Sequence, residues 1–398
     1  MKVSIDEIQV LEEVYPRDSF DNETVNNYCM NVDKLPPIVV SNEKILIDGY
    51  HRLLAHKLAE KMDIEAEFMD VPRDRILWEA TRLNSRHGKQ LSRAEKRRLS
   101  RHFYENNGCT QQAISDVLAV SPSTVSNWLT DLVQQAKEEQ KRQITDLYLR
   151  CLTQREIADK IGYSQRGVSE TIQKVKSELL DNPIVPESRQ LFNVWNFSGR
   201  EKKYGLDCKG KIPGQIIENI LYYYTAPFDI VVDPMVGGGT TIDVCKVMYR
   251  RYRAYDIKPL RDDIASHDIR NGFPDECKNC DLIFLDPPYY NGMDDEAECF
   301  KDLGEFYQFI GQLAKNSFKA IRENGIVSLL MLSRDNKGHD TLSVKCAKIF
   351  LDTKFDCIDH ISSPLTTQSA SAQEVVTAKK NRRLLGRNRD LYIFVRRN

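Results

Sequence analysis

The sequence lacks several features that would assign the protein to a class at once. No apolar run approaches the ~20 residues of a membrane-spanning helix, and no signal peptide opens the chain. The ten cysteines are scattered, and the single Cys-x-x-Cys, at Cys277 and Cys280, does not supply the four ligands of a zinc site. The formal net charge is only −1, so contact with nucleic acid must come from local basic patches. We therefore expect a cytoplasmic protein that binds no metal and no membrane.

The strongest pattern lies between residues 229 and 289. An apolar strand at 230–232 ends at Asp233, a glycine turn follows at 234–241, and an amphipathic helix runs from about 242 to 249. A second strand, at 252–255, ends in Asp256, whose carboxylate suits a ribose diol. The turn is neither Gly-x-Gly-x-x-Gly nor a P-loop with its Lys, so a pyrophosphate is not the expected ligand.

A third buried strand, at 281–285, runs into Asp286-Pro287-Pro288-Tyr289. Prolines have no N–H, so their carbonyls and the Asp286 carboxylate form a corner that offers only acceptors. Such a corner suits the exocyclic amino group of a planar base, with Tyr289 stacked on the ring. The strand order places this corner at the same sheet edge as the glycine turn.

These two motifs together resemble those of the amino-methylating DNA methyltransferases, over roughly residues 190–398. The resemblance implies S-adenosylmethionine as cofactor and a Rossmann-like class I domain. Met235 stands where the family usually has Phe, Asp268 is expected at the cofactor adenine, and residues 211–215 at the methionine end. The implied cofactor-binding residues are Asp233, Pro234, Met235, Gly237, Gly239, Thr240, Asp256, Asp268 and Pro213.

The resemblance also implies a reaction. The lone pair of a base amino nitrogen is delocalised into the ring, and acceptors at Asp286 and the Pro287 carbonyl would localise it. The predicted catalytic residues are Asp286, Pro287, Pro288 and Tyr289. The base must leave the duplex to reach them. Asp at the first motif position goes more often with adenine N6 than with cytosine N4, so adenine is favoured and cytosine stays open.

Residues 1–72 predict a small α/β domain. Leu35-Pro36-Pro37-Ile38-Val39-Val40 and Asp48-Gly49-Tyr50-His51-Arg52 resemble the ParB/sulfiredoxin-like domain. The resemblance implies a CTP site, with Asp48, Gly49, His51 and Arg52 as the candidate nucleotide-binding residues. The alternative is structural: Arg52 simply pairs with Asp48 or a neighbour. Sulfiredoxin chemistry would need a reactive Cys, and this pocket has none.

Residues 73–180 predict a helical DNA-binding region. Ten Lys or Arg stand against three acids between 73 and 101. Two helix-turn-helix patterns follow, at 110–129 and 152–169, with their first Thr residues 43 positions apart and a charged helix expected between them at 132–149. Second helices of such units enter the major groove. The candidate DNA-binding residues are Ser123, Thr124, Asn127, Gln165, Arg166, Arg97 and Arg98. The alternative is a bundle whose Ser and Thr only cap helices.

A multidomain chain results: a ParB-like domain (1–72), a helical region (73–180), a linker (181–200) and a methyltransferase domain (201–398). In the linker we expect Phe192, Trp195 and Phe197 to dock on the last domain, and residues 362–388 to form a mobile basic arm. We expect DNA methylation of duplex DNA, as in restriction-modification, with the N-terminal units holding the DNA. The alternative function is a CTP-gated DNA-binding regulator with a vestigial methyltransferase domain. The target sequence, a homodimer and a restriction-nuclease partner stay open.

Overall fold

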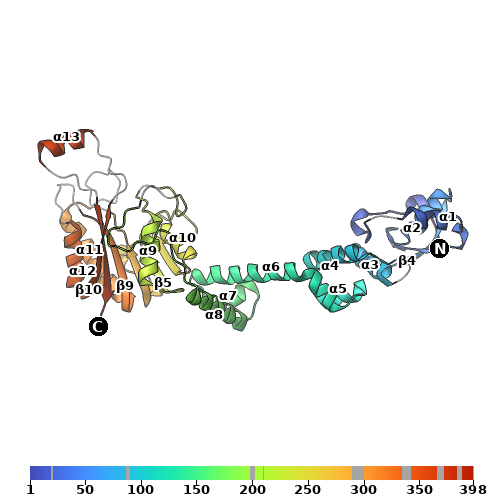
Figure 1. Cartoon of the computed structure of the whole chain (residues 1–398), viewed down its shortest axis with the longest axis horizontal. Coiled ribbons are helices and arrows are strands. Elements are labelled where there is room, and N and C mark those ends of the chain that lie inside the picture. Colours follow the sequence, from blue (N-terminus) through green and yellow to red (C-terminus); the bar gives the residue numbers. More distant parts are fainter. Residues whose placement is uncertain are drawn as a thin grey trace. The chain divides into compact units, whose positions relative to one another are not determined.

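The computed structural model describes residues 1–18, 21–86, 90–197, 202–208, 210–288, 300–333, 342–364, 372–382 and 388–397 (Figure 1). The chain forms two compact units, residues 1–139 and 140–398. The division falls inside one 28-residue helix, α6 (Pro122–Leu149). The helix expected at 132–149 is present, but it begins earlier, as a continuation of the second helix of the helix-turn-helix. No Gly or Pro follows Pro122 within this stretch, so nothing interrupts the helix. The predicted domain boundaries stay predictions.

The first unit opens with a four-stranded sheet in the order β1-β4-β2-β3. Its strands are β1 (Lys2–Ser4), β2 (Ile38–Ser41), β3 (Leu46–Asp48) and β4 (Asp63–Met69). Helices α1 (Asn22–Cys29) and α2 (Tyr50–Leu58) accompany it. Ile38, Val40 and Leu53 centre its core. The expected small α/β domain is therefore present. β4 and α1 were not predicted from the sequence.

The rest of the first unit is helical, with α3 (Ile76–Arg86), α4 (Arg93–Asn107), α5 (Gln111–Leu118) and the start of α6. The cap of α4 is a capping box in which Ser92 and Glu95 bond each other's backbone N–H groups. Thr110 caps α5, and Ala119 turns the chain with φ 50°. Leu99, Ile114 and Val125 pack beneath, so α5 and the start of α6 form a helix-turn-helix.

The second unit begins with another helix-turn-helix, α7 (Gln154–Ile161) and α8 (Gln165–Asp181), capped by Thr153 and Ser164. Its buried face shares one core with the large sheet, because Ile157 and Ile172 cluster with Val231 of that sheet. The turn before α7 also lies against a strand: Cys151 Sγ donates to Tyr252 O at 3.5 Å. This helix-turn-helix is thus an integral part of the second unit.

The large sheet has seven strands in the order β10-β11-β9-β8-β5-β6-β7. Their bounds are β5 (Ile230–Asp233), β6 (Arg251–Asp256), β7 (Ala265–Ser266), β8 (Cys280–Leu285), β9 (Ile321–Leu332), β10 (Phe355–Pro364) and β11 (Asn388–Arg396). β11 runs antiparallel to both neighbours, while β5 to β9 pair in parallel. β5 lies between β6 and β8, which is the switch point where such sheets bind ligands.

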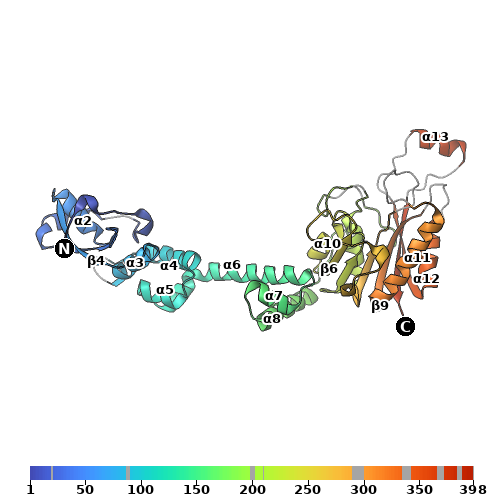
Figure 2. The ribbon, with the colours of Figure 1, turned by 180° about the vertical axis from the view of Figure 1, so that it is seen from behind.

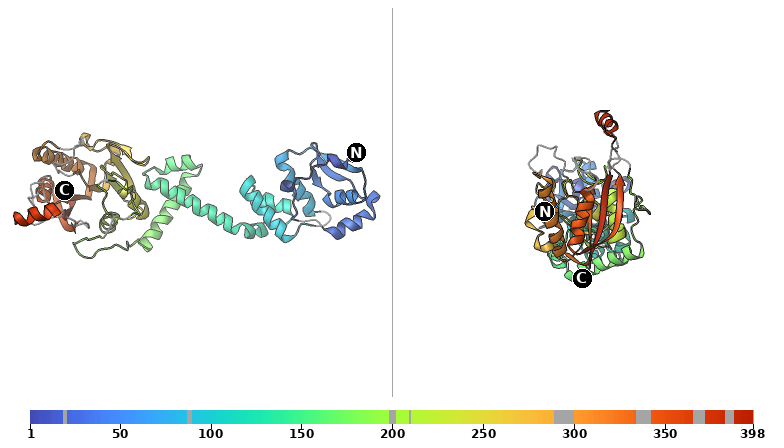
Figure 3. Two further views of the ribbon diagram at one scale, coloured as in Figure 1. Left: turned by 90° about the horizontal axis from the view of Figure 1, so that it is seen from above. Right: turned by 90° about the vertical axis from the view of Figure 1, so that its left-hand side faces the viewer.

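Helices cover both faces of this sheet (Figures 2 and 3). α9 (Gly214–Tyr224) and α10 (Thr240–Val247) contribute to one hydrophobic core, and α11 (Leu303–Ala320) and α12 (Leu342–Asp352) to the other. The strongly apolar strands β5 and β8 are buried between them, as expected of a parallel sheet. The expected multidomain fold with a Rossmann-like sheet is confirmed.

Two details of the second unit differ from expectation. Trp195 and Phe197 are buried, and Trp195 N donates to Ser362 O on β10 at 2.8 Å, but Phe192 is 79% exposed and does not dock. The basic stretch 362–388 was expected to be an arm without structure. It holds a helix, α13 (Ala372–Lys380). Among the described helices, none has the length and apolar character to cross a membrane.

Candidate active site

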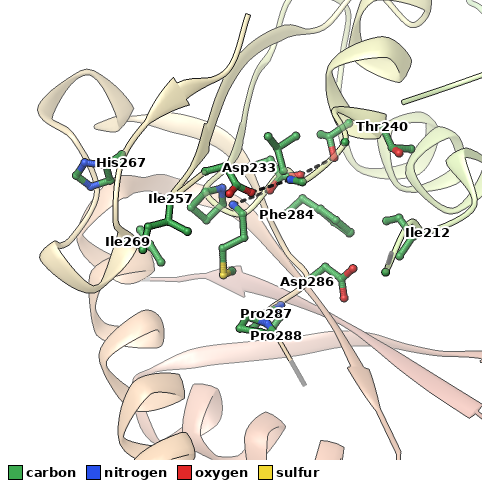
Figure 4. A pocket seen from close by; sticks show the side chains of 18 of the residues that line it. Ile212, Asp233, Thr240, Ile257, His267, Ile269, Phe284, Asp286, Pro287 and Pro288 are labelled. Atoms are coloured by element: carbon green, nitrogen blue, oxygen red, sulfur yellow. Dashed lines mark hydrogen bonds between the residues drawn. The ribbon is translucent and has the colours of Figure 1, made fainter. Parts of the chain in front are cut away.

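One cavity of about 410 Å³ joins the two motifs of the sheet edge (Figure 4). Its walls include the glycine turn after β5, the segment 256–270 after β6 and the corner after β8. Cys208, residues 210–212, Phe300 and Phe309 complete the lining. The predicted residues that line it are Asp233, Pro234, Met235, Gly237, Thr240, Asp256, Asp268, Asp286, Pro287 and Pro288. The structure therefore brings these residues together, as the switch-point topology requires.

Asp233 lies at the base of this cavity and is only 3% exposed. Its carboxylate accepts hydrogen bonds from Met235 N at 3.0 Å and from Thr241 Oγ1 at 2.6 Å. Burial raises the pKa of Asp233 to about 7, against the lowering effect of these two bonds, and the nearby carboxylates of Asp286 and Asp256 add to the rise. The cavity lining thus holds four carboxyl groups, and three of them, on Asp233, Asp256 and Asp286, interact electrostatically.

Contacts with Asp256 and Arg261 hold the glycine turn in place. Gly237 takes φ 54° and donates its N–H to Asp256 Oδ2 at 2.9 Å. Gly239 takes φ 85° and starts α10, and a Cβ there would stand 2.5 Å from Arg261 Nη1. Arg261 in turn binds Asp243 and Asp263, each at 2.8 Å. Gly239 therefore packs against this ion-pair cluster and is not among the residues that line the cavity. The cavity lining thus gives no support to its predicted contact with the cofactor.

Asp268 lines the cavity, but its carboxylate is already engaged. It accepts from Arg270 N at 2.9 Å and pairs with the Arg270 guanidinium at 2.8 Å. The hydrogen bond to Arg270 is the largest cause of a lowered pKa for Asp268. Pro213 caps α9 and is absent from the lining, whereas its neighbours Lys211 and Ile212 belong to it.

The acceptor corner follows β8 directly. Asp286 is half-buried, Pro287 is buried and Pro288 is exposed. Asp286 and Pro287 line the same cavity as Asp233 and face it together with Phe284 (Figure 4). The predicted stacking residue, Tyr289, lies outside the described residues.

Several apolar residues of the cavity escaped the sequence reasoning: Ile257, Ile269, Phe284, Phe300 and Phe309. Ile257 carried a usable signal, because it directly follows the acid that ends β6. Phe309 carried none, since on α11 it follows the same helical periodicity as core residues. These side chains give the cavity the apolar walls that a planar heterocycle requires.

The N-terminal nucleotide candidates are close together but occupied within the chain. The Arg52 guanidinium pairs with Asp48 at 2.8 Å and donates to Pro37 O at 2.5 Å and Pro36 O at 3.2 Å. His51 Nε2 accepts from Asp21 N at 3.0 Å. Gly49 takes φ 104° at the start of α2. The structural alternative for Arg52 is thus realised, and nucleotide binding stays a prediction.

The candidate DNA-binding residues split into two groups. Ser123, Asn127, Gln165, Arg166 and Arg97 are exposed. Thr124 is half-buried and its hydroxyl bonds Ser121 Oγ at 2.8 Å, so it helps to cap α6. Arg98 is tied to Asp18 at 2.8 Å and to Pro16 O at 3.0 Å. Arg166 pairs with Glu170 at 2.7 Å, and Ser123 Oγ shares a hydrogen bond with Ser121 Oγ at 2.8 Å. The predicted contacts with DNA stay predictions, and these four engaged residues would have to leave partners to make them.

Comparison with known proteins gives matches to parts of the chain. A family described as DNA methylase matches residues 71–266, which include the glycine turn and end 20 residues before Asp286. The type II methyltransferase M.BglII of Bacillus subtilis is 34% identical over 106 residues, 26% of this chain and 28% of that protein. The chain thus corresponds to little more than a quarter of this relative's length.

Solved structures overlap the chain in part. The C-terminally truncated partitioning protein ParB of Caulobacter crescentus, complexed to parS, is 17% identical, covering 44% of this chain and 99% of that one with a TM-score of 0.28. A TehB-like S-adenosylmethionine-dependent methyltransferase of Corynebacterium glutamicum is 12% identical, covering 48% and 90% with a TM-score of 0.32. The family match and the methyltransferase relative agree with the resemblance drawn from the motifs. Residues 71–266 of this chain are thus similar to a DNA methylase family.

Proposed function

We propose that this chain transfers a methyl group from S-adenosylmethionine to the exocyclic amino group of a base in duplex DNA. One observation carries the proposal: the glycine turn with Asp256 and the acceptor corner at Asp286 line a single cavity. A cofactor site and a base-amino site thus share one space. The family match supports the choice of DNA.

The cavity residues fit this cofactor chemically. Gly237 has room above its Cα, since a Cβ there would meet nothing within 4 Å. Asp256, which lines the cavity, would accept from ribose hydroxyls, and Met235, Ile257 and Ile269 would offer apolar surface to an adenine. The buried Asp233 and the half-buried Asp286 would suit a cationic ligand. When bound, the cofactor supplies an electrophilic methyl group.

The chain's own part is to hold the target amino group. Asp286 and the Pro287 carbonyl accept its two N–H bonds, which withdraws the nitrogen lone pair from the ring and makes it nucleophilic. Positioning and acceptor electrostatics account for this form of catalysis. Phe300 and Phe309, with Tyr289 as predicted, would offset part of the few kcal/mol needed to extrude the base.

Adenine N6 is our choice of target. It rests on Asp at the first position of the corner, and cytosine N4 would use the same geometry. We also propose that the exposed helix-turn-helix residues hold the DNA, because no large insertion after either motif offers a separate recognition domain.

The test is transfer of labelled methyl from S-adenosylmethionine to mixed genomic DNA, followed by nucleoside mass spectrometry. N6-methyladenine is the expected product. Asp286→Asn keeps the size of the side chain but turns a donor toward the amino group, and should lower kcat on the order of 10²- to 10³-fold, with cofactor affinity retained. Asp275→Asn, at an exposed site paired with Lys278, is the matched control and should leave transfer unchanged. Normal turnover by Asp286→Asn would overturn the assignment.

For the N-terminal region we propose CTP binding at residues 48–52, supported by the motif resemblance and by the left-handed Gly49 that opens α2. Because Arg52 is held by three acceptors, a bound nucleotide would have to compete with them or leave them intact. CTP-dependent clamping on DNA without any methyl transfer would instead favour the regulator with a vestigial methyltransferase domain.

A further inference from the structure

The connection between β10 and β11 is far longer than the hairpin needs. These antiparallel neighbours pair from Phe355↔Arg396 to Pro364↔Asn388. Such strands are ordinarily joined by two to five residues, but here residues 365–387 intervene and contain helix α13. Loops of this length within a compact domain usually serve a function.

The insertion emerges at the edge of the sheet that carries the candidate active site. β10 runs parallel to β9, since both pair antiparallel with β11, and β9 runs parallel to β8. Leu285, just before Asp286, pairs with Leu329, and the insertion leaves from Pro364, near the end of the same β9. Figure 1 shows α13 beyond this end of the strands. The helix therefore lies at the same end of the strands as the cavity.

Polar side chains fix the point where the insertion returns to the sheet. Asn388 accepts from Ser362 Oγ at 3.0 Å and donates to Ser333 Oγ at 3.2 Å. It also donates to Asp390, 8% exposed, which accepts from Ser343 Oγ at 2.6 Å. The ends of β9, β10 and the start of β11 are thus tied together.

The insertion is also strongly basic. Between 365 and 387 there are five Lys or Arg and one acid, a net +4 from 5 − 1, in a chain whose total is −1. Lys379, Lys380 and Arg382 are exposed, and none of the three forms an ion pair within the described part of the chain. Cations presented in this way suit a polyanion.

We propose that α13, through Lys379, Lys380 and Arg382, clamps the DNA backbone beside the extruded base. This inference rests on the proposed function and adds to it a phosphate-binding surface separate from both helix-turn-helix units. Phosphate contacts of this kind position DNA without reading its sequence.

The test compares two double variants of the full chain. Lys379→Ala with Lys380→Ala removes two charges from α13. Lys315→Ala with Lys319→Ala removes two exposed charges from the half of α11 that leads to the amino end of β9, and is the matched control. DNA affinity is measured from 50 to 200 mM salt, with steady-state methylation alongside. A charge-reversal pair, Lys379→Glu with Lys380→Glu, enlarges the effect.

Each lost phosphate contact should flatten the plot of log affinity against log salt by about 0.9. We expect the α13 variant to lose about 1.8 from the slope and to show a raised KM for DNA with kcat unchanged, while the control matches the unchanged chain. If the α13 and charge-reversal variants keep the slope and KM of a chain that binds and methylates DNA, the clamp is wrong but the proposed function stands. A complete lack of DNA binding by the unchanged chain would overturn both.

Discussion

Replacing Asp233 by Asn should change how stability depends on pH. In the folded chain the pKa of Asp233 is about 7, against an ordinary value of 3.8, because burial penalises the charged form. The folded state therefore keeps a proton that the unfolded state has already released. This stabilisation is fully present below pH 4 and is lost as pH rises through 7. At about 1.4 kcal/mol per pKa unit, the total is about 4 kcal/mol, of which about 3 kcal/mol falls between pH 5 and 8.

Asn is a close test of this reasoning. Its amide oxygen can still accept from Met235 N and its NH₂ can donate to Thr241 Oγ1, so both hydrogen bonds survive without a titrating proton. Between pH 5 and 8, the unchanged chain should lose about 3 kcal/mol more unfolding free energy than Asp233→Asn. Pulse proteolysis in urea measures this difference in unfolding free energy. The readout is the amount of intact fragment 140–398, the unit that contains Asp233. All other titrating groups are common to both chains, so parallel pH profiles would refute a raised pKa at Asp233.

Three further predictions concern other parts of the chain. Gly239→Ala forces a side chain into φ 85° and against Arg261, and should cost about 1–3 kcal/mol of stability in thermal unfolding; an unchanged midpoint would show that the turn relaxes freely. Arg52→Ala leaves Asp48 without its ion pair and should destabilise the N-terminal unit by about 1–3 kcal/mol in pulse proteolysis, with methyl transfer to short duplexes preserved; loss of that transfer would contradict a role confined to this unit. Asn127→Ala should reduce the difference in binding free energy between a preferred and a random DNA sequence by about 1–3 kcal/mol in competition assays. An equal loss of affinity for both sequences would argue against base reading.

The meeting of the two motifs was predictable, because carboxyl ends of parallel strands share one sheet edge. The apolar walls were not. Phe309 on α11 has the spacing of a core residue, and only the tertiary packing turns it toward the cavity. Asp268 lines the cavity, and its predicted contact with the cofactor adenine stays a prediction. Its engagement by Arg270 depends on a local turn that the motif does not encode.

Long-range packing explains the remaining differences. The charged stretch from residue 132 reads as a separate helix in sequence, yet it continues α6 without a break. Phe192 and Trp195 look equivalent in an aromatic linker, but only Trp195 meets the edge strand β10. For Arg52 the sequence offered a nucleotide site and a structural pair, and the pair with Asp48 is what the fold contains.

The contact of Cys151 with β6 limits where the chain can be truncated or fused to another protein. β7 covers β6 only at Tyr255 and Asp256, and the turn before α7 shields the strand beside Tyr252. A truncated chain that starts at residue 201 would bare this strand edge together with the apolar surface under α7 and α8, and should aggregate. A gene-fusion junction would therefore be tolerated ahead of residue 140 and not after residue 180. The second helix-turn-helix packs as part of the unit that holds the cavity, whereas the first belongs to the other unit.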